Sequence, residues 1–368
     1  MTFVFFFSEI LINLLIIITS IFFLFKIKFL KFINFNTSLF IYFYHTLFMI
    51  VMIVYGYYNP GDSNFYWKNV DKYEFEIFIG SNFMKLFLFY LKNYIHLSYS
   101  NLLLLLNFIG SLGILFFLDY IKHKYKKKDI FPVFFIILLP SLHLWPNTFI
   151  KETFILTLIF IFIWLNNKTK YFNLKLLIFF LTFLLRPYLG IILLFPFLIT
   201  EFQKSNNKTI ALIPLVCIMI SVFLSFIFFL KIHSIDFVNL NLLHLFDTII
   251  EKYKQLGHGS SYVSTDKFFL LNMASYIFSP VFFINYINGP MQIFFFLESL
   301  FLIYILFILL RNFDFHLSLE KSLYLLMVSL LLFIVAETTT NLGIILRQKW
   351  TILIFYIYIL IDGQKKQS

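Results

Sequence analysis

Long runs of apolar residues, separated by short polar segments, dominate the pattern along this chain. A helix needs roughly 20 such residues to cross a hydrocarbon core of about 30 Å. The runs predict spans at 3–25, 38–58, 100–120, 130–145, 150–166, 174–186, 188–200, 209–231, 291–310, 322–337 and 345–361. A membrane β-barrel would show short segments of alternating hydrophobicity instead. The pattern therefore predicts an all-α fold, a polytopic transmembrane helical bundle of about 10–11 spans.

Proline interrupts two of these runs, near residues 140–150 and at 186–187. Proline removes a backbone donor and disfavours helix at the residue before it, so Arg186-Pro187 should break the run 176–199. Each half is too short to cross a bilayer straight, which favours a broken or re-entrant segment buried in protein. A single kinked span is the alternative, and it would reverse the topology of everything downstream.

Charge sets the orientation of the spans. The chain is 61% hydrophobic and 13% charged, with a net charge of +11. Basic residues in short cytoplasmic loops explain this charge without nucleic acid as a partner. These clusters lie at 26–31, 122–128, 168–175, 204–208, 311–321 and 365–366. They predict a multi-pass protein of the bacterial inner (cytoplasmic) membrane, with a cytoplasmic C-terminus and outer segments at 59–99 and 232–278.

The first run has no basic n-region and no small-residue cleavage site, so we interpret it as a retained span. No repeat or linker divides the sequence, which predicts a single integral membrane domain over 1–368. The one cysteine, Cys217, excludes an internal disulfide framework and a cysteine metal cluster. We expect neither a metal nor a cofactor.

Charged residues at membrane depth are functional candidates because they are costly there. Arginine is notable in a chain with 26 lysines and three arginines. A guanidinium offers a rigid fork that binds phosphate with two hydrogen bonds, which makes Arg186 and Arg347 candidates for phosphate binding. Lys151 and Lys349 add further cations. The alternative for each arginine is anchoring at the membrane interface or pairing with a nearby Glu.

Polar residues at the predicted outer turns provide candidates for proton transfer and sugar contact. In "LLPSLHLWPNTFIKETF" (138–154), His143 and Glu152 could act as acid or base. Asp62, in "NPGDSNFYW", is a third candidate, although Pro-Gly-Asp-Ser is also ordinary turn chemistry. His258, in "GHGSSY", could touch sugar or phosphate, but the stretch lacks the GK[ST] ending of a P-loop. A simple outer turn is the alternative for the stretch 138–154.

Five stretches together carry a resemblance to a known family: "GDSNFY", "LLPSLHLWPNTFIKETF", "LLRPYLG", "GHGSSY" and "NLGIILRQKW". In this order they resemble O-antigen or exopolysaccharide polymerases of the Wzy type. Those proteins are similar in layout to glycosyltransferases of the C superfamily. The resemblance spans about residues 61–350. Many relatives have Gly-Lys-Asp or Gly-Lys-Glu where this chain has Ile150-Lys151-Glu152, so the glycine is missing here.

The resemblance implies polymerisation of oligosaccharide repeats linked to undecaprenyl pyrophosphate, at the outer face of the inner membrane. Glu152, His143 or Asp62 would serve as the base, while Arg186, Arg347, Lys349, Lys151 and His258 would bind pyrophosphate or glycan. The implied partners are the lipid-linked oligosaccharide, the lipid bilayer and a chain-length regulator protein. Two alternatives stay open. One is another lipid-linked-sugar glycosyltransferase or an O-antigen ligase, and the other is a transporter or flippase for lipid-linked glycans.

Overall fold

The computed structural model describes residues 2–27, 30–58, 62–72, 80–125, 131–148, 150–166, 171–204, 268–282, 289–315, 317–339 and 341–363. The chain divides into two compact units, Met1–Arg186 and Pro187–Ser368, and each is considered by itself. The boundary falls at the Arg-Pro pair that the sequence marks as a break. That both units form a single membrane domain stays a prediction.

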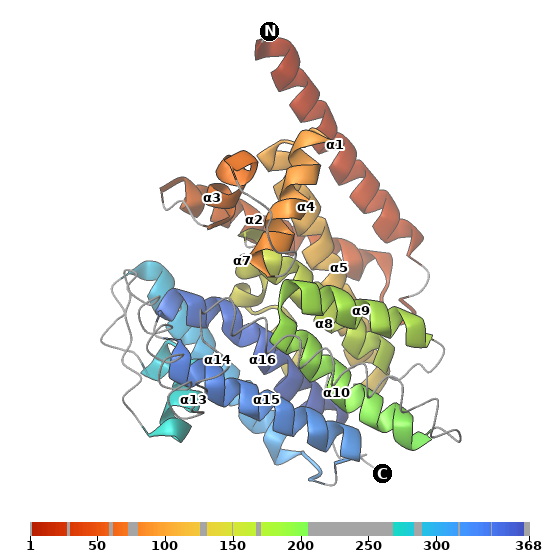
Figure 1. The fold of residues 1–368 in the computed structure, drawn as a ribbon, viewed down its shortest axis with the longest axis vertical. Helices are drawn as coiled ribbons and strands as arrows, with labels where there is room; N and C mark the ends of the chain where they lie inside the picture. The colour runs from red at the N-terminus through yellow and green to blue at the C-terminus, as the bar shows by residue number, and fades with distance from the viewer. Residues whose placement is uncertain are drawn as a thin grey trace, which may run out of the picture. The chain divides into compact units, whose positions relative to one another are not determined.

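The regular secondary structure of unit 1 is helical in its described residues, with short turns such as 30–34 and 94–98 between helices (Figure 1). Its helices are α1 (Thr2–Lys26), α2 (Phe35–Tyr58), α3 (Asp62–Asn69), a 3₁₀ turn (Val70–Lys72), α4 (Ser81–Asn93), α5 (Tyr99–Tyr125), α6 (Phe131–Ile137), α7 (Pro140–Thr148), α8 (Ile150–Asn166) and α9 (Phe172–Leu185).

Helix α5 forms the centre of unit 1, where it packs against α1, α2, α7 and α8. Its leucine-rich sequence buries side chains on several faces, among them Leu102, Leu106 and Phe117. A Cβ atom on Gly113 would lie 2.8 Å from the Cα of Thr157. The close approach of α5 and α8 therefore requires glycine at this position.

The long elements of unit 2 are also helices in its described residues. Its helices are α10 (Pro187–Lys204), α13 (Phe269–Ile277), α14 (Pro290–Arg311), α15 (Leu319–Thr338) and α16 (Leu342–Asp362). Helix α15 contacts α10, α13 and α16. The hydroxyl of Tyr324 in α15 donates to the carbonyl of Leu193 in α10 at 3.1 Å. Most side chains of α16 are buried, including Trp350 and Phe355, so this helix forms the core of unit 2.

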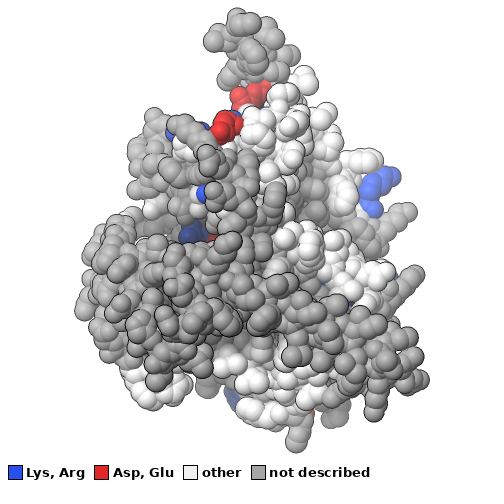
Figure 2. Space-filling view, in the orientation of Figure 1, with Lys and Arg blue, Asp and Glu red and all other residues white. Residues whose placement is uncertain are grey.

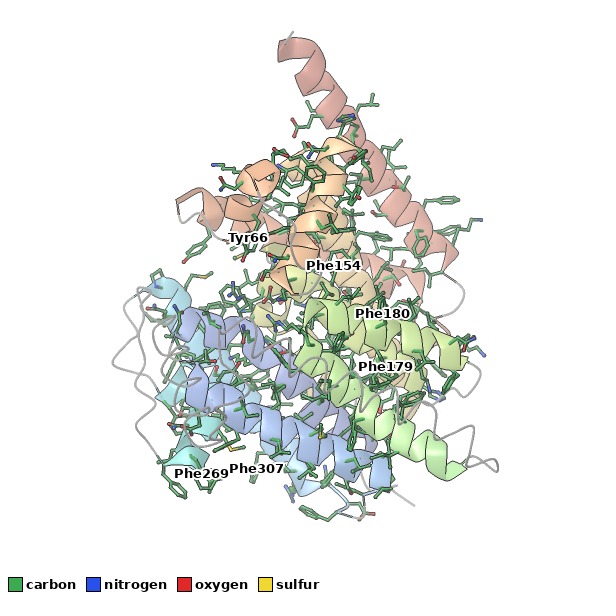
Figure 3. The ribbon with its side chains drawn as sticks, viewed as in Figure 1. Tyr66, Phe154, Phe179, Phe180, Phe269 and Phe307 are labelled. Atoms are coloured by element: carbon green, nitrogen blue, oxygen red, sulfur yellow. The ribbon has the colours of Figure 1, made fainter. Side chains whose placement is uncertain are left out.

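Six helices of the described part are long and apolar enough to cross a membrane, namely α1, α2, α5, α14, α15 and α16. Large apolar side chains are exposed on several helices, among them Phe180 and Phe307, which are labelled in Figure 3. Charged side chains are sparse among the described residues on the face drawn in Figure 2. The chain is a multi-pass membrane protein, and the predicted all-α polytopic bundle is confirmed.

The predicted break at Arg186-Pro187 is confirmed. Helix α9 ends at Leu185, Arg186 has an extended backbone (φ −147°, ψ 97°), and α10 begins at Pro187. The interruption near 140–150 is confirmed too, because α7 ends at Thr148 and α8 begins at Ile150. The predicted span 130–145 is wrong as one helix, because α6 ends at Ile137 and α7 begins at Pro140. Pro146 lies inside α7 rather than at its end. The hydroxyl of Thr153 donates to the Pro146 carbonyl at the α7–α8 junction.

Other predicted segments are only partly within the described residues. The span 209–231 lies outside them, as does most of the segment 232–278. In the segment 59–99, the described residues include α4, which buries Met84, Leu88 and Leu91. The membrane side of both segments stays a prediction.

The end of α4 is joined to the 3₁₀ turn by polar contacts. Lys92 Nζ and Asp71 Oδ2 are 2.6 Å apart, and Asn93 donates to Asp71 Oδ1 at 2.8 Å. These hydrogen bonds, that from Lys92 first, lower the pKa of the Asp71 carboxyl from its ordinary value. They fix α4 at its C-terminal end, while its N-terminal end approaches α9.

Candidate functional site

A buried ion pair joins the start of α8 to the end of α9. Glu152 lies in the first turn of α8, and Arg186 directly follows α9. Arg186 Nη2 and Glu152 Oε1 are 2.5 Å apart, and the two side chains are 5% and 6% exposed. The sequence predicts both as candidates, and one of its alternatives for Arg186 is pairing with a Glu. The structure brings the two together across 34 residues of chain.

Both members of the pair suit their helix ends. A helix carries partial positive charge at its N-terminus, where Glu152 lies, and partial negative charge at its C-terminus, where Arg186 lies. Neither charge would be tolerated alone at this burial, since an isolated buried ion is strongly unfavourable. Each charge of the pair thus stabilises the other and one helix end.

The N-terminal end of α4 also lies at this junction between α8 and α9. The N–H of Gly80, just before α4, donates to the carbonyl of Leu184 at 2.7 Å. Gly80 has φ +70°, a conformation that residues with a Cβ rarely adopt. A Cβ atom at Gly80 would lie 3.8 Å from Nζ of Lys151, which places this lysine at the same junction. We call Gly80, Lys151, Glu152 and Arg186 the junction cluster.

Aromatic contacts fix the helices that carry the junction cluster. Phe154 of α8 meets Phe87 of α4 with ring centroids 5.4 Å apart, in an edge-to-face arrangement. Phe179 of α9 packs against Phe162 of α8, with centroids 5.1 Å apart; Figure 3 labels Phe154 and Phe179. Such contacts stabilise beyond simple burial. They set the spacing of α4, α8 and α9 and hence of the charged groups.

His143 belongs to a different cluster, paired with His45 of α2. The two Nδ1 atoms are 2.9 Å apart, and His143 Nε2 lies 2.6 Å from the carbonyl of Ile137. A carbonyl only accepts, so His143 Nε2 carries the proton, and in the neutral ring Nδ1 is then the acceptor. His45 Nδ1 must therefore donate, which leaves its Nε2 as an acceptor.

This cluster is fully buried, because neither imidazole is exposed. Asn147 donates to the backbone carbonyls of both histidines, at 2.9 Å and 2.7 Å. A Cβ atom on Gly110 of α5 would lie 2.6 Å from His45 Nε2. Both ring nitrogens of His143 are engaged inside the protein, so its geometry suits the packing of α2, α5 and α7 better than proton transfer to a substrate.

Lys349 lies inside unit 2, where it is 1% exposed. Its Nζ donates to the carbonyl of Ser279 at 2.9 Å and to Ser299 Oγ at 3.2 Å. Glu298, itself buried, is close enough to attract Lys349 electrostatically. These contacts join α14, α16 and the turn after α13. Arg347, two residues earlier in α16, is half-buried.

Two predicted candidates have no described side-chain geometry. Asp62 begins α3, but its side chain lies outside what the structure describes, and His258 lies outside the described residues entirely. Sequence reasoning missed His45 and Gly80. A lone histidine within the apolar run 38–58 was a signal for the first, whereas nothing local marked the second.

The described part of the chain holds no group of three or more His, Cys, Asp or Glu side chains placed to hold a metal ion. That the chemistry needs neither metal nor cofactor stays a prediction. Comparisons with protein-family models, with curated proteins and with solved structures found no match to this chain. The functional argument therefore rests on the chain's own residues.

Proposed function

We propose that this protein is a membrane glycosyltransferase that polymerises oligosaccharide repeats linked to undecaprenyl pyrophosphate, at the outer face of the bacterial inner membrane. The observation that carries the proposal is the junction cluster. It combines a buried Arg-Glu pair 2.5 Å apart with a nearby lysine, at a break between helices. Irregular backbone of this kind is tolerated in a membrane where protein or an aqueous cavity surrounds it.

The proposed reaction uses the two charges in different roles. The oxygen of an acceptor hydroxyl forms a bond to the anomeric carbon of the donor glycan. The bond from that carbon to the diphosphate oxygen breaks, and its electron pair leaves with undecaprenyl pyrophosphate. The hydroxyl proton passes to the carboxylate of Glu152. Arg186 and Lys151 bind the diphosphate, where negative charge develops in the transition state.

The other candidate site residues have smaller roles in the proposal. Arg347 keeps a role in binding substrate phosphate, and Asp62 and His258 keep their predicted roles as base and glycan contact. We give His143 and Lys349 structural roles, because each is buried and its polar atoms bond to neighbouring groups. A chain-length regulator protein is the proposed partner. An O-antigen ligase or another lipid-linked-sugar glycosyltransferase would use the same chemistry with a different acceptor.

A transporter of lipid-linked glycans is the second candidate function. Lys349 and Glu298 favour it, because they are buried and oppositely charged within the apolar helices α16 and α14. Ionisable residues at such positions often mark the path of a substrate or ion. A transporter would move the lipid-linked repeat without changing its length, so glycan chain length separates the two functions.

The test compares Arg186→Lys, Arg186→Ala and Arg311→Lys in cells that lack their own copy of the gene. Charge-assisted hydrogen bonds contribute about 1.5–3 kcal/mol each, and about 1.4 kcal/mol is a factor of ten in rate. Arg186→Lys should therefore lower polymer formation per molecule of protein in the membrane roughly tenfold or more. Arg186→Ala leaves the buried Glu152 without its cation, and it should nearly abolish polymer formation even after correction for any loss of membrane abundance. Arg311, exposed in the last turn of α14, is the matched control. Full-length polymer from Arg186→Lys would contradict the proposal.

A further inference from the structure

We propose that Glu152 is an internal competitor for the anion site of Arg186, and that a diphosphate bound at Arg186 releases the Glu152 carboxylate. This inference rests on the proposed function, because it describes how the same cluster would be regulated. Glu152 then has two states. It is bonded to Arg186 when the donor is absent, and it is free to accept a proton when the donor is bound.

The geometry of the pair supports competition. A carboxylate and a phosphate both offer oxygen acceptors to the guanidinium fork, so they bind the same donor groups. Glu152 Oε1, 2.5 Å from Arg186 Nη2, takes a place that a phosphate oxygen would otherwise take. Both side chains are about nineteen-twentieths buried, so Arg186 needs an anionic partner in either state.

The backbone around the pair favours movement of the glutamate rather than of the arginine. The N–H of Arg186 donates to the Thr182 carbonyl at 2.7 Å, and Gly80 holds the carbonyl of Leu184. Arg186 is thus fixed at the end of α9. Glu152 can leave by rotation of its own side chain, while α8 stays in place through the bond from Thr153 to Pro146.

Lys151 provides a second cation for the diphosphate that replaces Glu152. It lies next to Glu152 in α8, and its Nζ approaches Gly80 at the same junction. A diphosphate carries more charge than one carboxylate and can be shared between Arg186 and Lys151. The exchange links the base to the donor, since the carboxylate is released only when the leaving group is in place. When no donor is bound, Glu152 therefore stays bonded to Arg186 and does not act as the base.

The test measures binding of inorganic pyrophosphate to the purified full-length protein in lipid nanodiscs, by isothermal titration calorimetry. Glu152→Gln removes the competing charge, so the affinity for pyrophosphate should rise about tenfold or more. Arg186→Lys should lower it by a similar factor. Glu9→Gln is the matched control, because Glu9 accepts from Ser100 at 2.5 Å elsewhere in unit 1. The pyrophosphate affinity of Glu9→Gln should equal that of the unmodified protein.

Several outcomes would overturn the inference. An unchanged or lower affinity in Glu152→Gln would show that the carboxylate does not compete, as would absence of pyrophosphate binding in every variant. If Glu152→Gln fails to fold, Glu152→Asp replaces it, because the shorter side chain withdraws the carboxylate. A smaller rise in affinity is then expected, and no rise overturns the inference.

Chain-length analysis separates this inference from the proposed function. Loss of polymer in Arg186→Ala, together with unchanged pyrophosphate affinity in Glu152→Gln, would support the polymerase and overturn the competition. Normal polymer in Arg186→Ala, together with tighter pyrophosphate binding in Glu152→Gln, would overturn the polymerase and leave the competition standing.

Discussion

Gly80 and Leu184 are 104 residues apart in sequence, yet the N–H of Gly80 donates to the Leu184 carbonyl at 2.7 Å. The last carbonyls of a helix lack partners within the helix, and Pro187 has no N–H to offer one of them. Gly80 satisfies one of these groups two residues before Arg186. Gly80, directly before α4, therefore helps to hold the broken end of α9 where the arginine meets Glu152.

We expect Gly80→Ala to destabilise unit 1. The backbone at Gly80, with φ +70° and ψ −127°, is strained for a residue with a Cβ, at a cost of about 1–3 kcal/mol. The melting temperature in detergent should fall, and polymer formation should fall with it if Gly80 positions Arg186. Gly289→Ala is the control, because its φ is −154° and a Cβ there would, among the described residues, meet only Gln292 at 3.9 Å. Equal melting temperatures for the two variants would count against the role of Gly80.

His45 and Gly110 should show energetic coupling. A methyl group at Gly110 would press on His45 Nε2, and the ring cannot easily retreat because Nδ1 bonds to His143. Gly110→Ala should cost about 1–3 kcal/mol of stability. Combining it with His45→Ala should cost less than the sum of the single changes, as a double-mutant cycle measures.

Gly113→Ala serves as the control for that cycle. Its added methyl group would meet the Thr157 backbone, which the loss of His45 does not move. The effects of Gly113→Ala and His45→Ala should therefore add. Additivity for Gly110 as well would refute the proposed contact with His45.

Asp119 should be essential for joining α5 to its neighbours. Its carboxylate accepts from the backbone N–H of Phe32 and from the indole N–H of Trp164, both at 2.8 Å. Asparagine has one oxygen, so Asp119→Asn leaves one donor facing an amide N–H. A buried donor without a partner costs about 1–3 kcal/mol, which should appear as lower thermal stability. Adding Trp164→Phe, which removes that donor, should recover part of the loss, and no recovery would argue against the contact.

Topology can be tested with reporter fusions. A reporter fused after Lys128 or Lys366 should be cytoplasmic, because basic loops stay on that side. One fused within 232–278 should be extracytoplasmic. These fusion points lie mostly outside the described residues, so the prediction comes from charge alone. A cytoplasmic reporter within 232–278 would mean that the break at Arg186-Pro187 does not return the chain to the same side, and the site would lose its outer position.

The sequence by itself determined which segments are helical and where the helices break. Apolar runs such as those of α5, α14 and α16 are helical because a membrane offers the backbone no other partners. The break at Pro187 was predictable from local chemistry, because proline lacks an N–H and disfavours helix at the residue before it. Proline alone does not dictate a break, since Pro146 lies inside α7.

Only the tertiary structure decided which polar groups meet. Arg186 pairs with Glu152 rather than standing free, His143 pairs with His45 across 98 residues, and Lys349 bonds to Ser279 across 70. Apolar periodicity cannot specify these partners, because the hydrophobic effect has no direction, whereas a hydrogen bond depends on atoms placed within a few tenths of an ångström. That placement follows from how α2, α5, α7, α8 and α9 pack, and in unit 2 from how α14 and α16 pack.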